Sequence, residues 1–193
     1  LAVARPAWAG APTDQLRGHI DRVLKVLEDP EMKKEARAKE RRSAVRKIAN
    51  EIFDFAETAR RSLGRHWAPR TPAEREEFVQ LFADLLERSY ISKIELYGGE
   101  KITYVSDTTE SDNAVVRTKI VTKQGTEVPV EYRMLRRGDR WLVYDVVIEG
   151  VSLVSNYRTQ FNKIIQTSSY QELVKKMKTK QEELSAPEGP GRG

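Results

Sequence analysis

The chain has 193 residues, 39% of them hydrophobic and 33% charged, which suits one ordinary globular domain with a heavily charged surface around a modest core. It contains no cysteine, which excludes a disulfide scaffold, a thiol nucleophile and Cys-ligated zinc, and no apolar run approaches the roughly 18 residues of a membrane span. The net charge of +5 favours anionic partners, and the excess is concentrated between residues 31 and 47.

The N-terminal residues predict the end of an export signal. Ala7-Trp8-Ala9 has the small-residue spacing of a signal-peptide cleavage site, although it is also compatible with an ordinary alanine-rich terminus. We interpret residues 1–9 as a signal remnant, 10–184 as a single domain, and 185–193, rich in Pro and Gly, as a disordered tail.

Apolar residues at helical spacing predict a series of helices in the first half of the chain. The first carries Leu16 to Leu27 and ends at Asp29-Pro30. A basic stretch then leads into an apolar stripe over 45–53, and a further stripe covers 55–63. The clearest helix N-terminus is Thr71-Pro72-Ala73-Glu74, where the Thr side chain can cap free backbone N–H groups and the Glu side chain can reach back to the capping residue. The helix that follows, as far as Tyr90, has a wide aromatic face.

Four strands are predicted at 101–106, 114–122, 127–136 and 141–149. Short turns at 123–126 and 137–140 join the last three strands, so the sheet should be an antiparallel meander. Helices are predicted again after Gly150, from Val151 and from Tyr170 to Leu184. The order of helices, meander and helices predicts an α+β fold.

The alternation of side chains along the strands predicts which face of the sheet is buried. In the third strand Val128, Val130, Tyr132 and Met134 share one face, and in the fourth Leu142, Tyr144, Val146 and Ile148 do. We expect these faces to point inward, because the opposite face of the fourth strand carries Asp145 and Glu149.

The basic stretch from Glu31 to Lys47 holds eight basic and three acidic residues. It is either a solvated helix face or a partner-docking surface, for which the candidates are Lys33, Lys34, Arg41 and Arg42. Aromatic residues are not interleaved with these charges, so specific nucleic-acid recognition is not expected.

Few residue patterns suggest catalysis. His19 and His66 lie far apart in the sequence and have no metal ligands at suitable spacing, and neither a nucleophile elbow nor a phosphate-binding loop is present. Asp145 and Glu149 could form an acid/base pair only in a cleft that perturbs their pKa values, and ion pairing with arginines is the simpler interpretation. We therefore predict no catalytic residue, no metal and no cofactor.

One long segment resembles a known family. Residues 141–161, from Trp141-Leu142-Val143-Tyr144-Asp145 to Phe161, resemble the signature of the toluene-tolerance, or MlaC-type, family of periplasmic phospholipid-binding proteins. Three further blocks agree in the same order, around Phe53-Asp54-Phe55, around Thr71-Pro72 with Phe78 and Leu81-Phe82, and at Val130-Glu131-Tyr132-Arg133. The resemblance covers roughly residues 16 to 184.

This resemblance implies a non-enzymatic phospholipid carrier in the periplasm of a Gram-negative bacterium. Such proteins are auxiliary components of an ABC lipid transport system: they pass phospholipid between an outer-membrane lipoprotein complex and an inner-membrane transporter with an MCE-type component. The implied fold is a nuclear-transport-factor-like cone with added helices and an apolar pocket between sheet and helices. The implied contact with membranes is transient and without insertion.

The motif does not fix individual pocket positions, so we assign these by the direction in which each side chain is expected to point. The predicted pocket residues are Phe55, Ala59, Leu63, Phe78, Phe82, Leu85, Tyr104, Val130, Tyr132, Tyr144, Val146, Ile148, Val151 and Leu153.

Three alternatives stay open at this point. The cargo could be another envelope lipid, such as a polycyclic one. The chain could be an enzyme of the same cone-shaped class that uses Asp145 or a tyrosine on a small apolar substrate, or an interaction module whose basic helix binds an acidic partner.

Overall fold

The computed structural model describes residues 11–185, with side chains as far as residue 181. The predicted signal remnant and the predicted tail beyond residue 185 lie outside this range. The described chain forms two compact units, each with its own packing. The sheet unit comprises the residues up to Asp54 together with Glu95–Leu153, and the helical unit comprises Phe55–Ile94 and the residues from Val154 onward.

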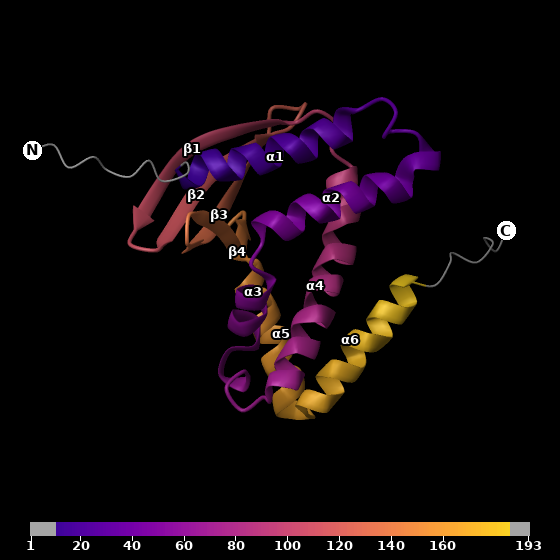
Figure 1. Cartoon of the computed structure of the whole chain (residues 1–193), viewed down its shortest axis with the longest axis vertical. Coiled ribbons are helices and arrows are strands. Elements are labelled where there is room, and N and C mark those ends of the chain that lie inside the picture. Colours follow the sequence, from indigo (N-terminus) through magenta and orange to yellow (C-terminus); the bar gives the residue numbers. More distant parts are fainter. Residues whose placement is uncertain (1–10, 186–193) are drawn as a thin grey trace, which may run out of the picture. The chain divides into compact units, whose positions relative to one another are not determined.

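The sheet unit contains two helices and one antiparallel sheet (Figure 1). The helices are α1 (Pro12–Glu28) and α2 (Ala38–Ile52), with a short 3-10 helix at Glu35–Arg37 between them. The strands are β1 (Lys101–Glu110), β2 (Asn113–Val121), β3 (Glu127–Arg137), β4 (Arg140–Ile148) and β5 (Val151–Ser152), in the order β1-β2-β3-β4-β5. The sheet therefore has five strands, and the prediction of four was wrong.

The fifth strand exists because the chain reverses at Glu149-Gly150. Both residues have positive φ angles, 49° and 81°, as the tight two-residue hairpin turns require. The turn pairs Ile148 with Val151 and Val147 with Ser152. The helix predicted to open at Val151 begins at Leu153 instead, as α5.

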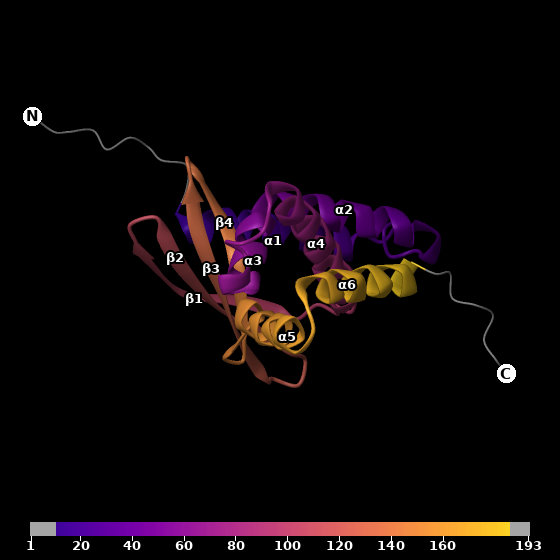
Figure 2. The same ribbon diagram turned by 90° about the horizontal axis from the view of Figure 1, so that it is seen from below.

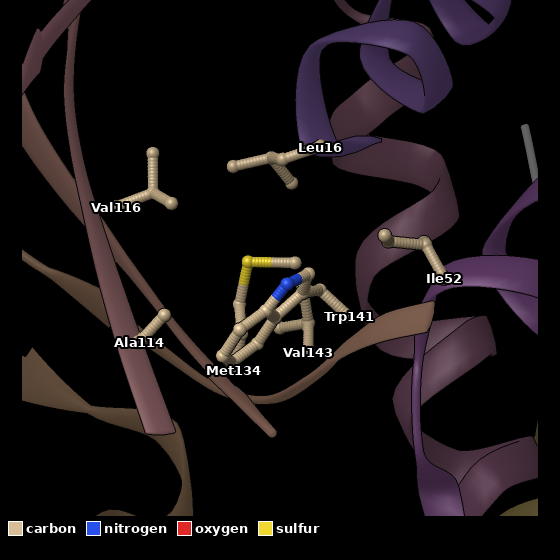
Figure 3. Close-up of a cluster of buried hydrophobic side chains, with 7 residues drawn as sticks. All are labelled: Leu16, Ile52, Ala114, Val116, Met134, Trp141 and Val143. Carbon is tan, nitrogen blue, oxygen red and sulfur yellow. The ribbon is translucent and has the colours of Figure 1, made fainter. Parts of the chain in front are cut away.

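The core of the sheet unit lies between α1, the end of α2 and one face of the sheet (Figure 3). Leu16 of α1 and Ile52 of α2 contact side chains of three neighbouring strands. Val116, Met134 and Val143 are completely buried there. The backbone also joins the layers, because the Asp54 N–H donates to the Val143 carbonyl at 2.9 Å. The sheet face covered in this way is called the inner face below.

The helical unit consists of α3 (Phe55–Leu63), a 3-10 turn (Gly64–His66), α4 (Pro72–Glu95), α5 (Leu153–Thr167) and α6 (Tyr170–Ser185), which Figure 2 shows from a second side. The predicted capping box is confirmed: the Thr71 N–H donates to Glu74 Oε2 at 2.7 Å, and the Glu74 N–H donates to Thr71 Oγ1 at 3.2 Å. Gly64 has φ +58° and lies against the Arg158 side chain, whose Nε donates to the Arg61 carbonyl at 2.8 Å.

Candidate functional site

The inner face of the sheet carries several of the predicted ligand-contacting residues. Strand register places Tyr132 opposite Val146 and Val130 opposite Ile148, all on this face. Tyr104 of β1 stands opposite Thr118, which itself pairs with Val130. These side chains therefore share one surface, as the alternation of β3 predicted.

A β-bulge at Tyr144 breaks the alternation of β4. Arg133 pairs with Asp145 but Met134 pairs with Val143, so Tyr144 is an extra residue in β4. An inserted residue shifts the alternation of the strand, so every side chain beyond it points to the opposite face from the one that simple alternation predicts. Val146 thus lies on the inner face together with Val143, whereas Leu142 lies on the opposite face. The prediction that Leu142, Tyr144, Val146 and Ile148 share one face was therefore wrong.

Exposure rises across the inner face toward the β4–β5 hairpin. Thr118 and Val130 are 2% and 3% exposed, whereas Ile148 is 41% and Val151 is 61% exposed. The last two are paired across the hairpin turn. Single exposed apolar side chains are common, whereas contiguous apolar surface is a feature of interaction sites. The hairpin thus presents two adjacent exposed apolar side chains, Ile148 and Val151.

Two tyrosines place hydroxyl groups among these apolar side chains. Burial raises the pKa of Tyr132 to about 12, and burial together with the nearby Asp21 carboxylate and Tyr132 raises that of Tyr104 to about 12. Both phenols therefore stay protonated at neutral pH. They can donate hydrogen bonds, but they are poor general bases.

The buried Asp145 is a structural anchor of the hairpin. It is 3% exposed, accepts a 2.6 Å hydrogen bond from Ser152 Oγ, and lies 3.3 Å from Arg133 Nη1. The carboxylate thus ties the two-residue strand β5 to β4 and β3. No local pattern indicates this contact, because Ser152 was expected in a helix. Glu149, which was considered as an acid/base partner of Asp145 and set aside in favour of ion pairing, is an exposed turn residue.

Six predicted contact residues belong to the helical unit. Ala59, Leu63, Phe78 and Phe82 are at most 1% exposed, and Phe55 and Leu85 are half-buried. The centre of this unit is an aromatic cluster from α4 and α5. Phe78, Phe82 and Phe161 have ring centroids 5.2 to 5.9 Å apart, and the Tyr157 centroid lies 5.1 Å from that of Phe82. From the helical stripe we assign Phe78 and Phe82 to the pocket, but the stripe does not indicate that they meet Phe161 and Tyr157 in one cluster.

The candidate docking residues separate into two groups. Arg41 Nη2 and Arg42 Nε lie 3.1 and 3.0 Å from the Glu95 carboxylate, which is 12% exposed, and Arg41 Nη1 donates to the Met32 carbonyl at 2.7 Å. These two arginines hold α2 to Glu95, the last residue of α4. Lys34 pairs with Glu31 within one turn, and Lys33 is exposed. Arg41, whose side chain is 13% exposed, is therefore the least accessible candidate, whereas the side chains of Arg42 and Lys34 are 57% and 60% exposed.

Both histidines have an oxygen atom of the protein within hydrogen-bond distance. His19 Nδ1 lies 2.8 Å from the Gln15 carbonyl, and His66 Nε2 lies 2.8 Å from Asn162 Oδ1. Among the described residues no cluster of three or more His, Cys, Asp or Glu is placed to hold a metal ion. No helix in the described part of the chain combines the length and apolarity of a membrane span. Two surface hollows are lined by Asp21, Leu24, Lys25, Glu28 and Asp29 and by Glu172, Lys175, Lys176, Thr179 and Lys180.

Residues 17–179 match the family model described as MlaC protein, which is most of the chain. The chain belongs to the MlaC family. One similar curated relative is the intermembrane phospholipid transport system binding protein MlaC of Haemophilus influenzae, which is 28% identical over 120 residues. That alignment covers 60% of this chain and 56% of the relative, so it spans a little over half of that relative's length.

A solved structure has the same MlaC-type fold. The phospholipid-binding protein from Ralstonia solanacearum, determined in complex with a phospholipid, superposes with a TM-score of 0.78 and is 23% identical. The match covers 92% of this chain and 100% of that one. At this level of identity the likeness establishes the α+β fold with its antiparallel sheet.

Proposed function

We propose that this chain is a phospholipid carrier of the periplasm, where it shuttles lipid between outer- and inner-membrane components of an ABC-type transport system and catalyses no reaction. The observation that supports this most is the family match over residues 17–179. The relatives named above are a phospholipid transport protein and a phospholipid-binding protein, and both functions are consistent with the exposed apolar side chains of the β4–β5 hairpin.

In this proposal the acyl chains lie against the inner face of the sheet, next to the β4–β5 hairpin. Burying one CH₂ group is worth about 0.8 kcal/mol. An acyl chain of about 16 carbons therefore needs on the order of 10 kcal/mol of replacement burial to leave a bilayer. Ile148 and Val151, 41% and 61% exposed, have the free surface to supply part of it. A charged headgroup would remain in water, so selectivity between headgroups should be weak.

The other positions of the predicted set remain part of the proposal. They are Tyr144 and Leu153, which flank the β4–β5 turn in the sequence, and the six residues of the helical unit. The proposed partners are an inner-membrane ABC transporter with an MCE-type component and an outer-membrane lipoprotein complex. The exposed Lys33 and Lys34 are proposed to contact such a partner.

The proposal is tested by native mass spectrometry and lipid extraction on the chain purified from a Gram-negative host. Phospholipids with mixed headgroups should co-purify at a fixed ratio to protein. A polycyclic lipid would revise the cargo, and a protein that takes up no lipid from vesicles would overturn the proposal.

A matched pair of variants locates the contact. Val151→Glu places a charge at the hairpin and should strongly reduce lipid retention. Val105→Glu introduces the same change at a valine of the same sheet that is 54% exposed, in the bulge of β1, and should leave retention unchanged. Equal retention in both variants would show that the hairpin does not contact lipid.

A further inference from the structure

Tyr104 has a buried hydroxyl group with no hydrogen-bond partner in the described part of the protein. Buried hydroxyl groups in native proteins are nearly always hydrogen-bonded, and an exception calls for an explanation. Tyr97, in the same unit, is an ordinary case, because its hydroxyl donates to the Glu100 carbonyl at 2.9 Å. The difference suggests that the Tyr104 hydroxyl serves a ligand.

The position of Tyr104 supports this interpretation. It stands at the β1 end of the cross-strand row that runs through Thr118 and Val130 to Ile148, so one row of side chains connects it to the exposed hairpin at the other end. Its ring is held from the helix side, because the Arg17 guanidinium of α1 lies 4.5 Å from the ring centroid. The hydroxyl is therefore a fixed donor at the end of a largely apolar row, with the Arg17 guanidinium and the Asp21 carboxylate of α1 beside it, and a few polar groups on an apolar lining are typical of ligand sites.

The surroundings of the hydroxyl determine which acceptor it suits. The Thr118 hydroxyl is already satisfied, since it donates to the Val130 carbonyl at 2.9 Å. Val130 is 3% exposed, so the row offers little water to a charged group. A phosphate there would carry a large desolvation cost and would be repelled by the nearby Asp21 carboxylate, which helps to raise the pKa of Tyr104 and which the Arg17 guanidinium offsets only in part. A neutral carbonyl oxygen loses much less on burial and is not repelled. In a diacyl lipid the ester carbonyl is the neutral acceptor attached directly to the acyl chain.

We propose that Tyr104 donates a hydrogen bond to an acyl ester carbonyl of the bound lipid, and that this contact selects ester-linked lipids over ether-linked ones. The inference rests on the proposed function. It adds a specific contact to a carrier that otherwise holds its cargo by apolar burial, and it places that contact at the acyl linkage and not at the headgroup.

The test compares two phosphatidylglycerols of equal chain length, one diacyl and one dialkyl ether. Delipidated protein is incubated with an equimolar mixture, and native mass spectrometry gives the ratio of the two bound species. The unmodified protein should prefer the ester by about five- to tenfold, since one hydrogen bond contributes about 1 kcal/mol. Tyr104→Phe should bind both equally, and Tyr97→Phe should retain the preference.

Stability of the lipid-free protein provides a second measurement. Removing a hydroxyl that has no partner should leave the urea midpoint of Tyr104→Phe unchanged or raise it. A lowered midpoint would mean that the hydroxyl is bonded within the protein, which overturns the inference.

The possible binding results separate the two proposals. If the unmodified protein binds neither lipid, the proposed function fails. If it binds both without preference, or if Tyr104→Phe keeps the preference, the carrier function stands and the inference is wrong. If Tyr104→Phe weakens both lipids equally, the hydroxyl contacts a group that the two lipids share, which also overturns the carbonyl assignment.

Discussion

The tie between Asp145 and Ser152 should contribute measurably to the stability of the sheet unit. Strand β5 has only two residues, and both pair with β4. The 2.6 Å hydrogen bond from the Ser152 hydroxyl to a carboxylate that is 3% exposed is charge-assisted, a type that contributes about 1.5–3 kcal/mol. The Arg133 pair should add less than about 1 kcal/mol, because that side chain is 40% exposed.

The perturbation is a double-mutant cycle of Ser152→Ala and Asp145→Asn. We expect Ser152→Ala to lower the free energy of unfolding by about 1–2 kcal/mol. The coupling energy between the two sites should be about 1 kcal/mol, because an amide oxygen still accepts the serine hydrogen bond but without the charge. For a chain of this size, a loss of about 1 kcal/mol lowers Tm by about 2–4 °C.

Urea unfolding followed by far-ultraviolet circular dichroism measures each corner of the cycle. Ser106→Ala, at an exposed serine of β1, is the matched control and should change stability by less than about 0.5 kcal/mol. The Asp145–Ser152 hydrogen bond does not stabilise the hairpin if Ser152→Ala changes the free energy of unfolding as little as Ser106→Ala does. The same conclusion follows if the effects of Ser152→Ala and Asp145→Asn are simply additive. Our account of β5 would then be wrong.

Three further predictions address other parts of the chain. Two arginines of α3 hold the pKa of the Glu57 carboxyl at about 2. The stability that the ionised carboxylate contributes is therefore fully present above the usual glutamate pKa and is lost as the pH falls toward 2. Glu57→Gln should lower the free energy of unfolding at pH 7 by about 1–2 kcal/mol and flatten the pH dependence of the urea midpoint between about pH 5 and 2. Met134→Ala, at a completely buried side chain, should cost about 2–5 kcal/mol in urea unfolding, and a loss below about 1 kcal/mol would contradict the core described here. Lys33→Glu should slow lipid transfer between vesicle-bound partner complexes without changing the urea midpoint of unfolding. Arg41→Glu should lower that midpoint, because the new carboxylate repels Glu95. Equal midpoints for the two variants would show that the Arg41–Glu95 contact has no structural role.

Local signals predicted a large part of the fold. The Thr71–Glu74 capping box and the glycine turn at 137–140 depend on interactions over a few residues, and both are found where the sequence placed them. The apolar stripe of a helix such as α1 depends on apolar residues that recur every three or four positions along the whole helix. These features can be predicted from sequence because each is determined by residues that lie close together along the chain.

The features that were missed depend on pairing between distant residues. Nothing in the composition around Tyr144 marks an inserted residue, because a bulge is defined by its neighbour strand. The Ser152–Asp145 bond requires the reversal at Glu149-Gly150, which was interpreted only as the end of a strand. Glu95 lies 54 residues from Arg41, so its role in neutralising the basic helix could not be seen along the chain.

The structure of the two sheet edges affects how readily the protein aggregates. A sheet with uncovered apolar side chains risks pairing with a second copy and growing into aggregates. At one edge β5 pairs with Val147 and Ile148 of β4 and the Phe53-Asp54 backbone bonds to Val143, and at the other edge a bulge at Val105 interrupts β1. Short and bulged edges are poor templates for a new strand. The protein can therefore keep Ile148 and Val151 open to a ligand while remaining resistant to self-association through its backbone.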